Sequence, residues 1–233
     1  MLDRSNIVTF GALGALTLLA WTWLLMGAGM SDMAAGLAVT VGMWSAMMVA
    51  MMTPSAAPMI LLYARAQRLS DWETRPSTAA FVGGYLLSWL AFAVLAAGQQ
   101  LLLEQAALIS GMGMALHGRK AGGAVMLLVG LYQLLPVKDA CLSRCRSPVE
   151  FLSRHYRPGP GGAWRMGLLH GAYCVGCCWL LMALLFVGGV MNLLWVAGLT
   201  LLVAAEKLLP QGRVISHVAG VALIGWGIVQ LLI

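Results

Sequence analysis

Charged side chains are scarce in this chain. Only 9% of its 233 residues are Asp, Glu, Lys or Arg, whereas soluble domains carry about 25%. The acidic residues number only eight. Hydrophobic residues make up 61% of the chain, and the mean hydropathy is +0.87. This composition excludes an ordinary soluble domain and predicts an integral membrane protein.

The sequence also lacks the motifs of several common functions. It contains no ATPase motif, no nucleotide-binding loop, no soluble metallochaperone module and no nucleic-acid-binding module. The first apolar run, residues 7–26, is longer than a signal-peptide core and has no small-residue cleavage site after it, so we expect a retained helix. The net charge is +6, and the basic residues lie between the apolar runs. This placement favours a signal for membrane topology over nucleic-acid binding.

Long apolar runs recur along the chain, and a helix needs about 20 such residues to cross the hydrocarbon of a bilayer. The sequence therefore predicts an all-α, polytopic transmembrane helical bundle of about seven spans, forming a single transmembrane domain over residues 1–233. The spans are expected at residues 6–27, 34–64, 79–108, 121–138, 166–188, 191–209 and 214–232.

The basic residues indicate the orientation of these spans. With seven spans, twelve of the fourteen Lys and Arg residues fall on the side of the amino terminus, and Arg119 and Lys120 alone fall on the other. The positive-inside rule then places the amino terminus in the cytoplasm. We expect a multi-pass protein of the bacterial inner membrane.

The longest hydrophilic stretch, residues 139–165, is expected as a cytoplasmic loop. Within it, the segment SPVE at 147–150 has the form of a helix start, with Ser as the cap, Pro in the first turn and Glu three residues after the cap. We expect a short interfacial helix there. The run RPGPGG at 157–162 predicts a non-helical hinge, and GGVMN at 188–192 predicts a tight turn between two spans.

Four soft-metal ligands lie in one apolar run, at His170, Cys174, Cys177 and Cys178. At about 100° per residue, all four fall within a stripe roughly 100° wide on one helix face. Thiolate and imidazole favour Cu(I), Zn(II) or iron–sulfur centres over magnesium or calcium. The alternative is that each cysteine serves only as a small buried hydrophobe.

A second pair, Cys141 and Cys145, closes the fourth span at its cytoplasmic end. The two are four residues apart and can share a helix face, and nearby basic side chains favour the thiolate. Because the fifth span starts at the same membrane face, we expect Cys141 or Cys145 to approach Cys174. The reducing cytoplasm and the odd count of five cysteines favour ligands over disulfides. Glu206 is a further candidate ligand, or alternatively half of an interfacial ion pair.

Methionine is unusually frequent, with sixteen residues, five of them between positions 43 and 52. Met43, Met47 and Met51 are four residues apart and form one helical stripe. Thioethers are soft, uncharged ligands suited to Cu(I), although methionine also fills gaps in apolar packing. Both interpretations of the stripe remain open.

These motifs together resemble a bacterial family of predicted metal-binding integral membrane proteins, sometimes labelled copper chaperones. The resemblance rests on four segments and covers most of the chain beyond the first span. They are MWSAMMVAMMTPSAAPM at 43–59, YQLLPVKDACLSRCRSP at 132–148, GLLHGAYCVGCCWLLM at 167–182 and MNLLWVAGLTLLVAAEKLLPQG at 191–212. The resemblance implies metal binding in a membrane, without specifying the metal or the direction of transfer.

Three functions follow from these patterns. The first is a membrane protein that binds Cu(I) through the cysteine and histidine ligands and exchanges it with a metal-donor or metal-acceptor protein. The second is a membrane thiol–disulfide oxidoreductase or electron carrier, in which the C-x-x-C pair Cys174 and Cys177 exchanges with Cys141 and Cys145. The third is a structural subunit whose cysteines hold a zinc ion between the fourth and fifth spans. The expected surroundings are the lipid bilayer, with no nucleic acid, and the oligomeric state is left open.

Overall fold

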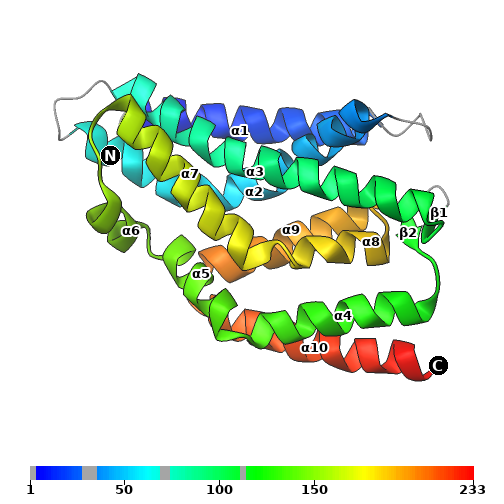
Figure 1. The fold of residues 1–233 in the computed structure, drawn as a ribbon. Coiled ribbons are helices and arrows are strands. Elements are labelled where there is room, and N and C mark those ends of the chain that lie inside the picture. The colour runs from blue at the N-terminus through cyan, green and yellow to red at the C-terminus, as the bar shows by residue number, and fades with distance from the viewer. Residues whose placement is uncertain (1–3, 28–35, 69–73, 111–113) are drawn as a thin grey trace. The chain divides into compact units, whose positions relative to one another are not determined.

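The computed structural model describes residues 4–27, 36–68, 74–110 and 114–233, and helices dominate it (Figure 1). The helices are α1 (Arg4–Leu25), α2 (Leu37–Arg68), α3 (Thr74–Gln105), α4 (Arg119–Leu134), α5 (Pro136–Arg146), α6 (Pro148–His155), α7 (Gly159–Cys178), the 3-10 helix η1 (Leu181–Ala183), α8 (Leu184–Gly188), α9 (Leu193–Leu208) and α10 (Gly212–Leu232). Two short strands, β1 (Ile109–Ser110) and β2 (Ala115–Leu116), pair antiparallel. The all-α prediction is confirmed, and the two-residue strands are an addition that the sequence patterns did not indicate.

Several helices have the length and apolarity to cross a bilayer. Among the described residues, four meet this requirement alone: α1, α2, α3 and α10. Two bent helix pairs, α4 with α5 and α7 with α8, would raise the number to six if each pair is one span. Helix α9, which covers most of the predicted sixth span, has 16 residues and at about 1.5 Å per residue is shorter than the hydrocarbon core. The chain is therefore a helical membrane protein.

The two bent pairs replace what the sequence predicts as single runs at 121–138 and 166–188. Helices α4 and α5 differ in direction by 64°, and α7 and α8 by 58°. The first bend has a clear cause, because Pro136 disfavours a helical conformation at the residue before it. Leu135 accordingly adopts extended backbone angles, φ −75° and ψ 141°. The second bend falls at residues 179–183, where a turn leads into the 3-10 helix.

The hydrophilic stretch at 139–165 is more helical than the sequence predicts. Helix α6 begins at Pro148, after Ser147, although the Ser147 side chain makes no capping hydrogen bond. The expectation of a non-helical hinge over 157–162 is wrong in part, because α7 begins at Gly159 and includes Pro160. Proline is tolerated in the first turn of a helix, where its missing N–H would have no intrahelical partner. Further along the chain, residues 189–192 do break the helical run, with Asn192 as the N-cap of α9.

The chain forms two compact units. Unit 1 comprises residues 1–97 and 143–175, and unit 2 comprises residues 98–142 and 176–233. In unit 1, α1 packs on α2, and α6 also contacts α2. Helices α3 and α7 approach so closely that a Cβ atom on Gly167 would overlap the Phe81 carbonyl oxygen. Small residues permit such close approach of helices in bilayers.

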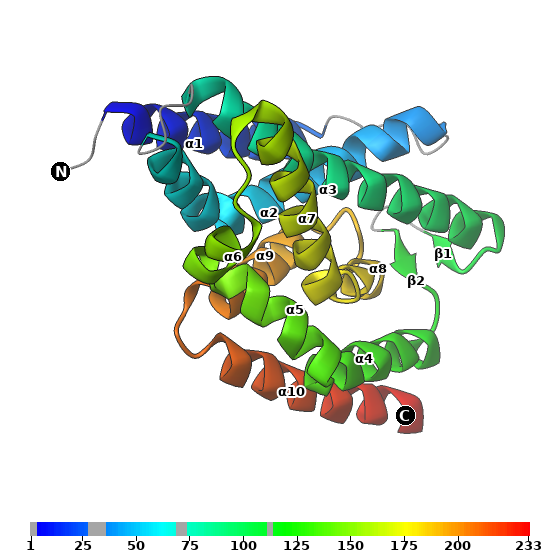
Figure 2. The ribbon, with the colours of Figure 1, turned by 60° about the vertical axis from the view of Figure 1, so that its left-hand side comes forward.

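In unit 2, α4 and α10 lie side by side, as Figures 1 and 2 both show. Their backbones meet at glycines, and a Cβ on Gly130 would lie 2.7 Å from the Gly220 carbonyl oxygen. Helix α8 packs against α4 and β2, and α9 contacts α8 and α10. The packing of this unit therefore again depends on small residues at a helix interface.

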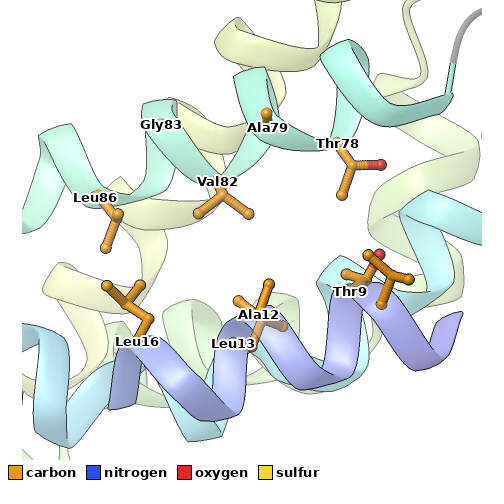
Figure 3. Close-up of a pocket in the computed structure, with 10 residues that line it drawn as sticks. Thr9, Ala12, Leu13, Leu16, Thr78, Ala79, Val82, Gly83 and Leu86 are labelled. Carbon is orange, nitrogen blue, oxygen red and sulfur yellow. The ribbon is translucent and has the colours of Figure 1, made fainter. Parts of the chain in front are cut away.

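A groove of about 510 Å³ runs between α1 and α3 within unit 1. In Figure 3, Leu16 and Leu86 face each other at one end of it, and Thr9 and Thr78 lie at the other. The lining between these ends is apolar, which fits an environment of lipid tails.

Candidate metal centre

Two cysteines from separate helices meet in unit 1. The Cys145 thiol, in the last turn of α5, donates towards the Cys174 sulfur in α7, and the two Sγ atoms are 3.4 Å apart. Cys174 is buried, whereas Cys145 is half-buried. The expectation that Cys141 or Cys145 would approach Cys174 is met by Cys145. All five cysteines are described, and none forms a disulfide.

His170 stands one helical turn before Cys174, and its Nε2 atom is 3.8 Å from the Cys174 sulfur. The side chain is 1% exposed. Phe81, Tyr85 and Phe151 surround the imidazole, with ring centroids 5.2 to 6.2 Å from it. Its Nδ1 atom is buried and has no hydrogen-bond partner among the described residues. The surroundings of this imidazole are therefore aromatic, and a buried ring nitrogen without a partner is costly.

Basic and aromatic side chains flank the thiol pair on the α5 side. The Arg144 guanidinium lies 4.7 Å from the centre of the Tyr173 ring and also donates a hydrogen bond to the Tyr173 hydroxyl. Arg146 follows Cys145 directly in the chain. Positive charge beside a cysteine favours its thiolate, which is the form that binds a metal. The pair is therefore suited both to soft-metal binding and to thiol chemistry.

The other three cysteines belong to unit 2. Cys177 and Cys178 end α7 and are each 1% exposed, while Cys141 is half-buried in α5. Cys141 faces Gly176, since a Cβ there would lie 3.2 Å from its sulfur, and Tyr132 donates a hydrogen bond to the Gly176 carbonyl oxygen. The ligand stripe predicted from the sequence is thus shared between the two units, with His170 and Cys174 in one and Cys177 and Cys178 in the other.

Glu206 is engaged in a buried polar network of unit 2. Its Oε2 atom is 2.8 Å from Lys138 Nζ, and its Oε1 atom accepts a hydrogen bond from Gln133 at 2.8 Å. Ser216 in turn lies within 3.2 Å of the Gln133 side-chain oxygen. The sequence patterns did not indicate Gln133 or Ser216, and they indicated Lys138 as a topology signal and as a basic neighbour of Cys141 and Cys145, not as the partner of Glu206. The available signal was the position of Lys138 inside a predicted span, because buried charges in membranes need partners.

The methionines of the predicted stripe are all buried in α2. Met43, Met47 and Met51 are 3%, 2% and 1% exposed. Trp44 and the backbone carbonyl of Met52, which accepts from the Tyr85 hydroxyl, belong to the same packed region of unit 1. The burial agrees with gap-filling in the core and is equally compatible with thioether ligands screened from water.

Few metal-ligating side chains lie together in this structure. In the parts of the chain that the structure describes, no group of three or more His, Cys, Asp or Glu side chains has the arrangement of a metal site. The Cys145 and Cys174 sulfurs lie 3.4 Å apart, which makes a pair of donors. Fold and site together define a helical membrane protein in which a thiol pair, one member buried and one half-buried, lies beside a histidine.

Comparison with known proteins assigns the chain to a family. It belongs to the PpoB2 family, described as copper chaperone, whose model matches residues 41–230. The matched region begins inside α2 and includes every cysteine, the histidine and the methionine stripe. Neither the curated proteins nor the solved structures contain a significant match. The family and the apolar helices fit a membrane protein that handles metal.

Proposed function

We propose that this protein is a membrane copper chaperone that binds Cu(I) between Cys145 and Cys174, and that His170, whose Nε2 atom is 3.8 Å from the Cys174 sulfur, moves in as a third ligand when the metal binds. The observation that carries the proposal is the 3.4 Å separation of two sulfurs from different helices. Metal–thiolate bonds are about 2.3 Å long for zinc, so two thiolates that share one ion lie roughly 4 to 4.5 Å apart. The pair, at 3.4 Å, would therefore open by roughly 1 Å or less to share one ion.

The choice of copper follows from the small number of donors and their softness. Thiolate ligands select soft ions such as Cu(I), and Cu(I) accepts two or three ligands. A structural zinc site requires four, and no such group exists among the described side chains. In the same proposal, Cys141, Cys177 and Cys178 form a further set of soft donors, and the stripe of Met43, Met47 and Met51 supplies weak, uncharged ones. Glu206 acts through its ion pair with Lys138 instead of as a ligand.

The proposed setting is the bacterial inner membrane, with seven spans and the amino terminus in the cytoplasm. Its support is the unequal distribution of basic residues in the sequence. In this arrangement α9 is the sixth span, and its ends reach the interface only if the bilayer thins locally or adjacent residues extend it. In this orientation the thiol pair lies at the cytoplasmic face, where a metal-donor or metal-acceptor protein can reach it.

The test is Cu(I) binding by purified full-length protein in competition with a chromogenic chelator. We expect Cys145→Ser and Cys174→Ser each to weaken binding at least about 100-fold, which is 2.7 kcal/mol, because each removes a thiolate from a site with few donors. Cys141→Ser is the comparison on the same helix, and it should weaken binding less, because it removes one donor of the further set and leaves the Cys145–Cys174 pair intact. Equal affinity in wild type and in both test variants would remove the proposal.

The same sulfur pair favours one second candidate, a thiol–disulfide oxidoreductase. Two thiols 3.4 Å apart need to close by more than 1 Å to reach the S–S bond length of about 2.05 Å. They would give up two electrons and two protons to a disulfide substrate, which would be reduced to two thiols. The structure pairs Cys174 with Cys145, whereas the sequence predicted a C-x-x-C pair with Cys177. Alkylation and mass spectrometry after equilibration with glutathione buffers distinguish the two candidates, since a copper chaperone keeps the pair reduced.

A further inference from the structure

A polar pocket of about 320 Å³ lies beside the thiol pair, at the junction of α5 and α6 in unit 1. Its charged and titratable lining consists of Arg144, Glu150, Arg154 and His155, and two serine hydroxyls complete the polar wall. Its volume is at the lower end of the range of small-molecule sites, roughly 300–1,000 Å³. The pocket is therefore large enough for a small peptide-like ligand and too small for a protein domain.

Phe151 separates this pocket from the metal centre. The Phe151 ring stacks on His155 on the pocket side, with centroids 4.8 Å apart, and meets His170 edge-on at 5.2 Å. Phe151 is itself a lining residue of the pocket and is 3% exposed. One aromatic side chain thus divides the polar pocket from the buried imidazole next to Cys174. A rotation of this ring would connect the two.

The pocket carries positive charge. Glu150 and Arg154 form an exposed ion pair at 2.8 Å, which cancels one charge of each sign. The contacts of Arg144 are with the neutral Tyr173 hydroxyl and ring, and none of the ion pairs between described residues includes it. The lining therefore has a net charge of +1 with His155 neutral. A pocket of this sign repels a free copper cation and attracts an anion.

We propose that this pocket admits Cu(I) as a small anionic thiolate complex whose carboxylates contact Arg144 and Arg154. This inference rests on the proposed copper site and names the form in which its cargo arrives. Cu(I) keeps its oxidation state during the transfer. The sulfurs of Cys145 and Cys174 replace two carrier thiolates, and the two protons lost by the cysteines leave on the carrier as thiols. Arg144 and Arg154 bind the carrier while the Phe151 ring rotates out of the path between the pocket and the cysteines.

The experiment measures how fast the full-length protein, in uncharged nanodiscs, takes up copper from two donors. One donor is Cu(I) with excess glutathione, which is anionic, and the other is Cu(I) with excess cysteamine, a cationic thiol without a carboxylate. We expect wild type to load about tenfold faster from glutathione at low salt, since electrostatic steering changes association rates by 10-fold or more. The double variant Arg144→Gln, Arg154→Gln should lose this preference, because the net charge of the pocket becomes −1.

A matched control removes two positive charges elsewhere on unit 1. Arg65 and Arg165 are exposed and lie outside the pocket, so Arg65→Gln, Arg165→Gln should keep the preference for glutathione. Arg144→Lys, Arg154→Lys should restore most of it, which separates charge from the loss of packing on Tyr173. With copper in excess, each variant should still reach the wild-type copper content, because the Cys145 and Cys174 sulfurs remain. The loss of positive charge at Arg144 should lower the affinity for copper by disfavouring the thiolate, and the chelator titration measures that effect separately from the loading rates.

Equal loading rates from the glutathione donor and the cysteamine donor in wild type would overturn the proposal. The proposal would be overturned in that case even if an acidic protein donor loaded the site efficiently. The same conclusion would follow if the Arg65 and Arg165 variant lost the preference as completely as the pocket variant. Failure of the underlying copper site is a separate result, because it would appear as unchanged equilibrium copper content in Cys145→Ser and Cys174→Ser.

Discussion

Lys138 and Glu206 form a buried ion pair, with Nζ and Oε2 2.8 Å apart and side-chain exposures of 0% and 2%. Lys138 comes from α5, immediately after the bend at Pro136, and Glu206 from α9. Gln133 donates to the other carboxylate oxygen, so both oxygens have partners. The pair therefore ties α5 to α9 within unit 2.

Lys138→Met should destabilise the protein strongly, because it leaves the Glu206 carboxylate buried without its counter-ion. Removing one partner of a buried pair costs about 3–5 kcal/mol, which for a chain of this size lowers Tm by about 10 °C. The measurement is thermal unfolding in detergent. Glu150→Gln is the control, since it breaks an exposed pair with Arg154 worth about 1 kcal/mol or less. A fall in Tm of only 1 or 2 °C for Lys138→Met would contradict this role.

Gly167→Ala should loosen the contact between α3 and α7. A Cβ at this position overlaps the Phe81 carbonyl oxygen, which is backbone and cannot move aside cheaply. We expect a loss of at least about 2 kcal/mol, within the range for overpacking a tight contact. Gly161→Ala is the matched control on the same helix, because its Cβ would meet nothing within 4 Å. The control should be neutral or slightly stabilising, since alanine favours helix over glycine by up to about 1 kcal/mol. Similar melting temperatures for the two variants would argue against the close packing.

His170→Ala should weaken Cu(I) binding without abolishing it. The two thiolates would remain, so we expect a loss of about tenfold, or 1.4 kcal/mol, which is smaller than the effect of either cysteine variant. X-ray absorption spectroscopy of the copper-loaded protein gives an independent readout. The wild-type spectrum should contain a nitrogen neighbour that is missing in the variant, and identical copper spectra would show that His170 is not a ligand.

Reporter fusions test the proposed orientation. With seven spans and the amino terminus inside, fusions at Gly118 and at Ile233 should both report the outer face, and a fusion at Arg157 should report the cytoplasm. The expectation rests on the basic residues and on α9 crossing the membrane. A cytoplasmic signal at Ile233 would mean that α9 does not span the membrane and that the predicted fifth and sixth spans are wrong in number.

The membrane class and helical architecture of this protein follow from the sequence alone. Apolar runs of about 20 residues indicate membrane-spanning helices by their length, since the backbone has few alternatives to a helix inside a bilayer. The turn at 189–192 and the helix start at Pro148 were also readable, because glycine, proline and serine act locally. The helical pitch placed His170 and Cys174 on one face. Each of these features is determined by residues that lie close together in the sequence.

The tertiary structure decided which distant groups meet. Sequence spacing could not choose between Cys141 and Cys145 as the neighbour of Cys174, because the two lie on one helix and the choice depends on the 64° bend between α4 and α5. It also could not pair Glu206 with Lys138, which is 68 residues away. Whether a buried charge finds a metal or a counter-ion depends on the rotation of separate helices about their axes. Packing sets that rotation, and in α7 the close contact of Gly167 with the Phe81 backbone is one of the contacts that fix it.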